Sequence, residues 1–578
     1  MVNVEATRPK RGAAESPAAA AAPAAPGKGD VPVPDGIPSG FRGPSRQVKL
    51  RVAWRRHHRP LTVVACLSAV LLLYVAYLGQ SRSLGTDADG AGNVLQAWDM
   101  LHGNPLLRGW WLSDVSFYTT ELPQYMLVEL ARGLNPGVIN AAGAATYTLL
   151  LTLAALVAKG RATGTTGLLR VLITGGIMLA PGPSVLSSPN HTGTQVPLLL
   201  IWLVIDRFGD RWYLPWLVGA LLTWVEMADQ LAVYVGALPV IVVSAIRLYQ
   251  RRGSWRIDAG LLVAAAASVV LAMAGTLLIR RVGGFVVAPT HVAFIASAQL
   301  PHNLSLTAEA VLTLFGADFF GLRAGPSAAI ALLILTGVVL VAWACCIAAR
   351  RLLAEDGRLV PILFVGISIN LAAFAVSTLA VDLGSAHELA AELPFGAVLA
   401  GRLLPGRPAT TALRPALVAV LVGYAGVLAY HATRPPRPPT TQAVASWLTA
   451  NHLTAGIGDY WTANITTVAT SGRVAVRPVE LTCGRFSPDA WESRQSWYEP
   501  PSTATFLVLA LTNGAGADGT AASAAAQFGA PVRTARIGAY EVLVWNHDLL
   551  PAVTGGFARG CGPPWLEAEH AGGWLVRS

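Results

Sequence analysis

Charged residues are scarce in this chain. Only 13% of its 578 residues are Asp, Glu, Lys or Arg, against roughly a quarter in a soluble globular domain, whereas 53% are hydrophobic. This balance excludes a soluble enzyme, because so much apolar sequence requires an apolar solvent in addition to water, and that solvent is the lipid bilayer. The net charge of +10 does not indicate nucleic-acid binding, since the basic residues form short clusters between apolar runs, where they act as topology signals.

Cysteine is also rare, and several motifs are missing. The five cysteines form no CxxC or Cys/His spacing of a metal site. Cys66, Cys345 and Cys346 lie in apolar runs and are expected to be small buried hydrophobes. Cys483 and Cys561 fall in the polar C-terminal part, where a disulfide between them is one of two open alternatives. The chain has no P-loop and no dinucleotide fingerprint, and HEL at 387–389 is not followed by the second histidine of a zinc protease.

What the chain has in abundance is long apolar runs. Residues 1–55 are rich in Ala, Pro and Gly and predict a disordered cytoplasmic tail. A first run follows RVAWRRHHRP, and it predicts a membrane anchor because no A-x-A cleavage site follows it. We therefore expect a transmembrane domain over 56–432 with about eleven helices. The ten further runs lie at about 137–158, 167–187, 194–206, 212–227, 230–248, 258–281, 326–349, 359–381, 389–404 and 412–431.

Basic residues alternate along these runs and predict the topology. They gather at every second connection, which the positive-inside rule assigns to the cytoplasm together with the N-terminus. An odd number of spans then places residues 436–578 outside the cell membrane, where the short β-like runs GRVAVRPV, ATFLVLAL and YEVLVW predict an α/β domain. The basic residues at the predicted inner ends are Lys159, Arg161, Arg170, Arg207, Arg211, Arg247, Arg251, Arg252, Arg256, Arg350, Arg351, Arg358, Arg402, Arg407 and Arg414.

The long first outer loop, 80–136, carries the strongest candidate site. It mixes acidic and aromatic residues and contains a D-x-D at Asp87 and Asp89. In a strand-like stretch this spacing directs both carboxylates to one side, where they would share a divalent cation such as Mg²⁺ or Mn²⁺, or one would act as a base. The alternative is a solvated loop in which Asp87 starts a turn.

Further polar residues stand at the predicted outer ends of the helices. Ionisable groups at membrane depth are costly and favour a functional role, although each could equally be a loop charge or a helix cap. Arg280 and Arg281 break the positive-inside pattern before the second long outer loop, 282–325; they either bind an anionic ligand or snorkel to the headgroups. The other candidates for the cavity are His191, Glu226, Asp229, His387 and Glu388.

Three stretches carry a family resemblance. TDAD at 86–89, AWDMLHGNPLLRGW after it and HELAAELPFGAVLAGRLL from His387 onward resemble actinobacterial members of the GT-C superfamily of membrane glycosyltransferases, which includes protein mannosyltransferases and the aminoarabinose transferase of lipid A. The resemblance covers the layout of residues 60 to 430.

The resemblance implies an inverting transfer from a polyprenyl-phosphate sugar, in an outward-facing cavity, to a glycan, lipid or protein acceptor. Only Asp87 and Asp89 match the family's acidic motif; one would be the base, and the other would position it or hold a metal. Arg280 and Arg281 are then candidates for the lipid phosphate, because guanidinium forks suit phosphate oxygens.

Two other classes of function remain open at this point. A transporter or flippase would show internal repeats and ionisable residues at the membrane midplane, but no clear repeat is present and the ionisable residues lie at span ends. A non-catalytic cell-envelope assembly protein would use the C-terminal domain to bind a glycan or a partner. The aromatic residues of that domain, which could equally be core residues, are Tyr460, Trp461, Trp491, Trp497 and Tyr498.

Overall fold

The computed structural model describes residues 46–289, 292–354, 357–412, 414–511 and 519–555. Most of the predicted cytoplasmic tail, residues 1–45, lies outside them. The chain divides into two units, Met1–Ala65 and Cys66–Ser578. The second unit begins within helix α1 (Arg46–Leu84) and contains all the other described helices and strands.

The chain is a multi-pass helical membrane protein, and every predicted apolar run is a helix. Six helices are long and apolar enough to cross a membrane: α1 over Leu61–Leu84, α4 (Gly137–Lys159), α9 (Trp255–Arg281), α11 (Pro326–Arg351), α12 (Leu359–Val376) and α15 (Arg414–Ala432). Two shorter apolar helices are α7 (Leu214–Glu226) and the η2 (Val233–Ala237) and α8 (Leu238–Tyr249) pair. The remaining runs form α5 (Gly164–Ile177), α6 (Thr192–Phe208) and α13 (Glu392–Leu403).

The structure has fewer helices of membrane-spanning length than the eleven that the sequence predicts. Helix α5 has 14 residues and α13 has 12, so at about 1.5 Å per residue they are only about 20 Å long, shorter than the ~30 Å hydrocarbon core. Six long spans are found, and the prediction of about eleven is not confirmed.

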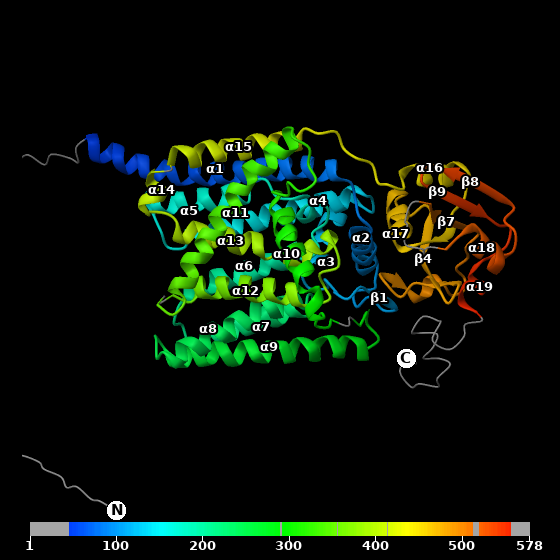
Figure 1. The fold of residues 1–578 in the computed structure, drawn as a ribbon, viewed down its shortest axis with the longest axis horizontal. Coiled ribbons are helices and arrows are strands. Elements are labelled where there is room, and N and C mark those ends of the chain that lie inside the picture. The colour runs from blue at the N-terminus through cyan, green and yellow to red at the C-terminus, as the bar shows by residue number, and fades with distance from the viewer. Residues whose placement is uncertain (1–45, 290–291, 355–356, 413, 512–518, 556–578) are drawn as a thin grey trace, which may run out of the picture. The chain divides into compact units, whose positions relative to one another are not determined.

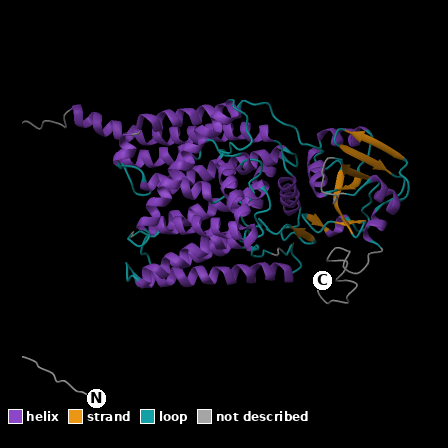
Figure 2. Ribbon diagram, in the orientation of Figure 1, coloured by secondary structure: helices purple, strands orange, loops and turns teal. Residues whose placement is uncertain are grey.

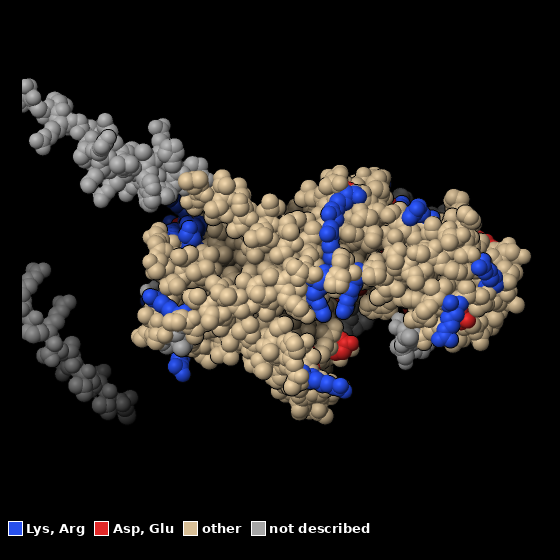
Figure 3. Space-filling model, turned by 90° about the horizontal axis from the view of Figure 1, so that it is seen from above, with Lys and Arg blue, Asp and Glu red and all other residues tan. Residues whose placement is uncertain are grey.

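The helices divide into buried and lipid-facing ones. In α4, 67% of the most apolar window is buried, because it packs against α5, α6 and α13, whereas in α9 the share is 17%. The exposed face of α9 carries Val263, Val270, Met273 and Leu278, which would be unfavourable in water but suits lipid. Accordingly, in Figure 3 the Lys and Arg side chains of the helical part lie at its two ends, with an uncharged face between them in that view.

Ion pairs link helices at one end of the helical part. Arg402 donates from Nη1 to Asp206 Oδ1 at 2.8 Å, and Arg358 donates from Nε to Asp258 Oδ1 at 2.7 Å. Both arginines belong to the basic set that the sequence assigned to the inner ends. They therefore join helices as well as marking topology, because each guanidinium is held by a carboxylate from another helix.

The segments predicted as long outer loops contain structure at the opposite end. Residues 80–136 form α2 (Ala88–Leu101), β1 (Trp110–Leu112) and α3 (Glu121–Arg132). Residues 282–325 include β2 (Val286–Val287) and α10 (Leu300–Phe315). Helix α10 packs into the core of the helical part through Leu306, Ala310 and Leu314. In Figure 1, α2 stands across the ends of the other helices, next to the C-terminal domain.

The C-terminal domain is built on a mixed six-stranded sheet in the order β5-β4-β3-β7-β9-β8. Its predicted strands are confirmed as β4 (Ala475–Thr482), β7 (Phe506–Ala510) and β9 (Tyr540–Val544). Cys483 is disulfide-bonded, and its predicted partner Cys561 lies outside the described residues. In Figure 2 the strands lie in this domain and in a small sheet beside it. The other elements are β3 (Ala455–Gly458), β5 (Arg485–Pro488), β8 (Arg533–Ile537), α16 (Gln442–Ala450), α17 (Tyr460–Ala469), α18 (Ala521–Phe528) and α19 (Leu550–Thr554).

The small sheet joins the C-terminal domain to the outer segments. Its middle strand β1 pairs in parallel with β2 and antiparallel with β6 (Ser493–Arg494) of the C-terminal domain. Beside it, the carboxylate of Asp99 accepts hydrogen bonds from Arg494 Nη1 at 2.8 Å and from Trp110 Nε1 at 2.7 Å. Backbone pairing and a charged hydrogen bond thus fix the domain against α2 and β1.

Candidate active site

A cavity of about 470 Å³ opens where the outer segments meet the C-terminal domain. Four of the predicted site residues line it: Asp89, His191, His387 and Glu388. The walls come from four parts of the chain, so no local sequence window contains the site. The other lining residues are Ser113, Asp114, Val115, Phe117, Asn190, Tyr460, Trp461, Asp489, Trp491 and Glu492.

The D-x-D motif lies at the start of a helix, so the expectation of a strand-like pair was wrong. Asp87 is the N-cap of α2, and its Oδ1 accepts a hydrogen bond from Gly90 N at 2.7 Å. Burial, and then the charge of Asp89, raises the pKa of Asp87 to about 6, although the Gly90 amide and nearby serine hydroxyls oppose the shift. Asp87 therefore starts the helix, and Asp89, in its first turn, lines the cavity.

Asp89 is bonded to a residue of the C-terminal domain. Its Oδ1 accepts a hydrogen bond from the Tyr460 hydroxyl at 2.5 Å, and the same hydroxyl lies 3.0 Å from Glu492 Oε2. Glu492 is 1% exposed. Burial, and then the charge of Asp89, raises the pKa of Glu492 well above its ordinary value. The two carboxyls thus share one phenol at the boundary between the domain and α2.

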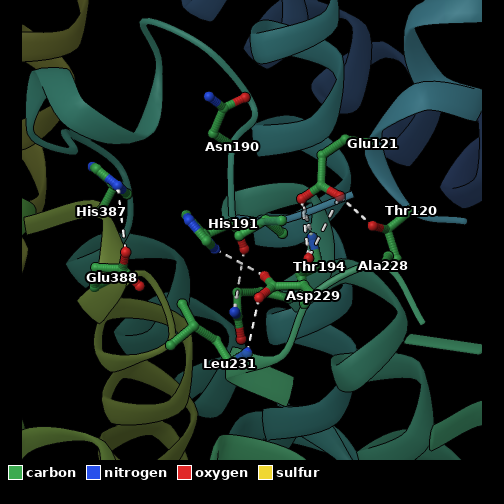
Figure 4. Close-up of polar contacts among 12 residues, drawn as sticks. Thr120, Glu121, Asn190, His191, Thr194, Ala228, Asp229, Leu231, His387 and Glu388 are labelled. Carbon is green, nitrogen blue, oxygen red and sulfur yellow. Dashed lines mark hydrogen bonds and ion pairs between the residues drawn. The ribbon is translucent and has the colours of Figure 1, made fainter. Parts of the chain in front are cut away.

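On the membrane side, His191 and Asp229 form a buried pair (Figure 4). His191 precedes α6 with a left-handed backbone, φ 55°, and its Nδ1 lies 2.9 Å from Asp229 Oδ2. The other oxygen of Asp229 accepts from Leu231 N at 2.9 Å. Burial lowers the pKa of His191, but the charges of Asp229 and Glu388 outweigh it and raise this pKa to about 10. Asp229 thus favours the protonated imidazole of His191, whose Nε2 proton any metal ion bound there would have to displace.

Glu121 stands behind this pair and was not among the predicted site residues. It begins α3, is fully buried, and accepts from Thr194 N at 2.8 Å and Thr194 Oγ1 at 3.1 Å. A Cβ on Gly193 would come within 2.6 Å of Glu121 Cγ, so the glycine makes room for it. The sequence signal was an acid at a helix start after Thr120.

His191, His387 and Glu388 form a group that can hold a metal ion. Their ligand atoms all lie within 4.8 Å of one another. His387 Nδ1 is 2.7 Å from Gly384 O, and its Nε2 is 3.7 Å from Glu388 Oε1. Because both histidines engage Nδ1 with an oxygen, each keeps Nε2 for another ligand, which is the arrangement of metal-ligating histidines with an outer hydrogen-bond partner.

The C-terminal domain supplies one wall of the first cavity. The sequence alone did not show which of its aromatic residues belong to that wall. Of its five singled-out aromatic residues, Tyr460, Trp461 and Trp491 line the cavity. Tyr498 is a core residue instead and donates to Pro478 O, and Trp497 packs on Trp110 with ring centroids 5.0 Å apart.

Asp489, in the same wall, was not predicted at all. Burial, and then the charge of Glu480, raises the pKa of Asp489 to about 8. Both Asp489 and Glu492 were hidden from sequence analysis because only tertiary packing brings them to the cavity.

Two of the remaining predicted residues line a second cavity, of about 440 Å³, beside α9. Glu226 and Arg280 line it together with apolar residues such as Met273 and Leu277. Glu226 is buried and accepts from Ser268 Oγ at 3.1 Å, whereas Arg280 is exposed. Arg281 is exposed as well and does not line this cavity. The predicted set is therefore divided between two cavities.

The wall between the two cavities is short. Residues Ser116 and Phe117, whose segment borders the first cavity, both donate their backbone N–H to Ala228 O, at 3.1 Å and 3.0 Å. Ala228 lies between Glu226 and Gln230, which border the second cavity. The two cavities are thus bordered by segments that hydrogen-bond to each other.

The structure was compared with known proteins. No protein-family model and no curated protein matches the chain. Among solved structures, ArnT from Cupriavidus metallidurans bound to undecaprenyl phosphate is 13% identical, with 83% of this chain and 97% of that chain covered and a TM-score of 0.49. The Archaeoglobus fulgidus oligosaccharyltransferase tethered with an acceptor peptide is 10% identical, with 77% and 69% covered and a TM-score of 0.42. In both comparisons the sequence identity is 13% or less and the TM-score is below 0.5.

Proposed function

We propose that this protein transfers a sugar from a polyprenyl-phosphate donor to an acceptor hydroxyl outside the cell membrane, with Asp89 as the base. The observation that carries the proposal is the position of the Asp89 carboxylate. It lines a cavity of about 470 Å³, which is within the usual range for a small-molecule site. The other carboxylate of the motif, Asp87, is engaged as a helix cap.

The chemistry follows from one base and one displacement. Asp89 takes the proton of the acceptor hydroxyl while the acceptor oxygen forms a bond to the anomeric carbon. The bond between that carbon and the donor phosphate breaks in the same step, and polyprenyl phosphate leaves with the bonding electrons. Because the oxygen attacks the face opposite the leaving group, the transfer inverts the anomeric configuration.

The second cavity suits the lipid part of such a donor. Its apolar side, with Met273 and Leu277, would take an isoprenoid chain along α9, and the guanidinium of Arg280 would meet the phosphate. The short wall at Ala228 would then bring the phosphate end toward Asp89. Arg281 is left to the headgroup region of the membrane.

A divalent cation fits the site at His191, His387 and Glu388. Two imidazoles and one carboxylate favour a zinc-like ion over Mg²⁺ or Mn²⁺, which prefer oxygen ligands. When bound, such an ion would stabilise negative charge on a phosphate leaving group. The sequence had pointed to Asp87 and Asp89 as ligands, but each already accepts a hydrogen bond from the protein, from Gly90 N and Tyr460 respectively.

We further propose that the N-terminus is cytoplasmic and the C-terminal domain extracytoplasmic. The disulfide at Cys483 supports this orientation, since disulfides persist in oxidising compartments. The acceptor, whether glycan, lipid or protein, would reach the cavity from that side.

The test is glycosyl transfer by purified full-length protein in detergent from a panel of polyprenyl-phosphate sugars. We expect turnover with one donor class and a loss of about 100-fold or more in Asp89→Asn, the usual size of a general-base effect. Asp318→Asn, an aspartate of another outer connection, is the matched control and should keep full activity. An Asp89→Asn protein as active as wild type would refute the assigned base. No turnover with any donor would favour the transporter or assembly alternatives.

A further inference from the structure

Asp89 contacts the C-terminal domain through the Tyr460 hydroxyl, and the number of available protons determines which group donates in this contact. The Tyr460 hydroxyl carries one proton but lies within 3.0 Å of two carboxyl oxygens, Asp89 Oδ1 and Glu492 Oε2. It can donate to only one of them. The contact with Asp89, at 2.5 Å, is shorter than the 3.0 Å contact with Glu492, so Asp89 is assigned as the acceptor of this proton. The contact with Glu492 then needs a proton of its own.

Glu492 is placed to supply that proton. Its side chain is 1% exposed, and a Cβ on Gly92 of α2 would come within 1.6 Å of its Oε2, so helix α2 covers the carboxyl and leaves it little contact with water. No cation is paired with Glu492 among the described residues, and a buried carboxyl without a cation is more stable when neutral. Glu492 therefore donates to the Tyr460 oxygen, and Tyr460 donates to Asp89.

We propose that Tyr460 and Glu492 are positioning residues with which the C-terminal domain completes the active site. They hold the Asp89 carboxylate in its reactive orientation, so the base works only when the domain is docked. This inference rests on the proposed role of Asp89 as the base. It assigns the C-terminal domain a part in the chemistry beyond covering the cavity.

The first experiment measures kcat and KM for the donor in single variants. Tyr460→Phe removes only the hydroxyl, and we expect kcat to fall about 10- to 100-fold with little change in KM, as for a misplaced catalytic group. Glu492→Leu should lower kcat similarly. Glu492→Gln should recover most of that loss, because its amide can still donate to the Tyr460 oxygen. Tyr498→Phe, which removes a buried hydroxyl from the same domain, is the matched control for general destabilisation and should keep kcat.

Two results of this experiment would overturn the inference. One is a Tyr460→Phe protein with wild-type kcat while Asp89→Asn is inactive. The other is a Glu492→Gln protein as impaired as Glu492→Leu, because Glu492 would then act through its negative charge.

A second measurement does not depend on transfer activity. Melting temperatures of the full-length protein are compared for wild type, Asp89→Asn, Tyr460→Phe and the double variant. Residues that bond directly give non-additive changes, so additive changes would overturn the inference even if no donor is turned over. If Asp89→Asn is active but the cycle is non-additive, the contact stands and the assigned base is what fails.

Discussion

Gly92 is the position at which a single methyl group should separate the C-terminal domain from the catalytic helix. It lies in α2 facing Glu492, and a Cβ built there would be 1.6 Å from Oε2 and 2.6 Å from Cδ of that residue. Both distances are far below contact distance, so Gly92→Ala requires the whole Glu492 side chain to move. Glu492 is 1% exposed, so its side chain can yield only toward the cavity of about 470 Å³ that it lines, away from its present contact with Tyr460.

The net effect follows from three terms of known size. Alanine in place of glycine stabilises a helix interior by about 1 kcal/mol. Overpacking a closed interface costs about 1–3 kcal/mol, and losing the hydrogen bond between Glu492 and Tyr460 costs about 1 kcal/mol more. The unfavourable terms outweigh the helix gain, so we expect Gly92→Ala to destabilise the docked domain by about 2 kcal/mol.

The assay is thermal unfolding of the detergent-purified protein, followed by limited proteolysis to detect release of the C-terminal domain. Gly426→Ala in α15 is the matched control, because nothing lies within 4 Å of a Cβ at that glycine. It should leave the melting temperature unchanged or higher. In a Glu492→Ala background the effect of Gly92→Ala should disappear, since the colliding atoms are gone. The reasoning is refuted if Gly92→Ala melts like the Gly426→Ala control, or if its effect persists in the Glu492→Ala background.

Three further changes test other parts of the structure. Asp99→Asn should weaken domain docking by about 1 kcal/mol, because it removes the charge that binds the partly exposed Arg494, and faster proteolytic release of the domain would report it. Arg280→Gln should raise KM for a polyprenyl-phosphate donor about tenfold, the value of one charged hydrogen bond, whereas Arg281→Gln, outside the cavity, should leave KM unchanged. Asp489→Asn should raise the melting temperature at neutral pH. The pKa of Asp489 is about 8 in the folded protein and 3.8 ordinarily, so folding favours the neutral carboxyl. The stability of the wild-type protein therefore falls as the pH rises between these two values. The difference between the two proteins should vanish below pH 3.8.

The helices were predictable because a long apolar run indicates a segment that is buried, either in lipid or among the other helices. Each predicted run is a helix, but hydropathy alone could not tell a lipid-crossing helix such as α9 from a short buried one such as α13. Helix α10 was predicted as loop because LPHNLSLTAEAVLTLF mixes His, Asn and Glu with its apolar residues. Its apolar face nevertheless packs into the core of the helical part. This packing depends on the helices around α10, which the local sequence does not show.

The site was predictable only where topology brings its residues together. Asp89 stands in the predicted first outer loop, and His191, His387 and Glu388 stand at predicted outer helix ends. The structure places all four on one cavity. The local geometry of Asp87 could also have been predicted, because an aspartate followed by an acid in the first turn is a helix-start signal. Tyr460 and Glu492 could not, since they reach Asp89 across more than 370 residues of sequence.

Three contacts between α2 and the C-terminal domain explain why that domain matters for the base. Asp89, Gly92 and Asp99 meet Tyr460, Glu492 and Arg494 respectively. At about 100° per residue these three positions fall within roughly 80° of one another around the helix, so a single face of α2 serves the domain along about 15 Å. A rigid helix held at both ends transmits displacement from one end to the other. Loosening the Asp99 end should therefore lower kcat at the Asp89 end, although Asp99 does not line the cavity. If Asp99→Asn releases the domain but leaves kcat unchanged, docking and catalysis are independent and this account of α2 is wrong.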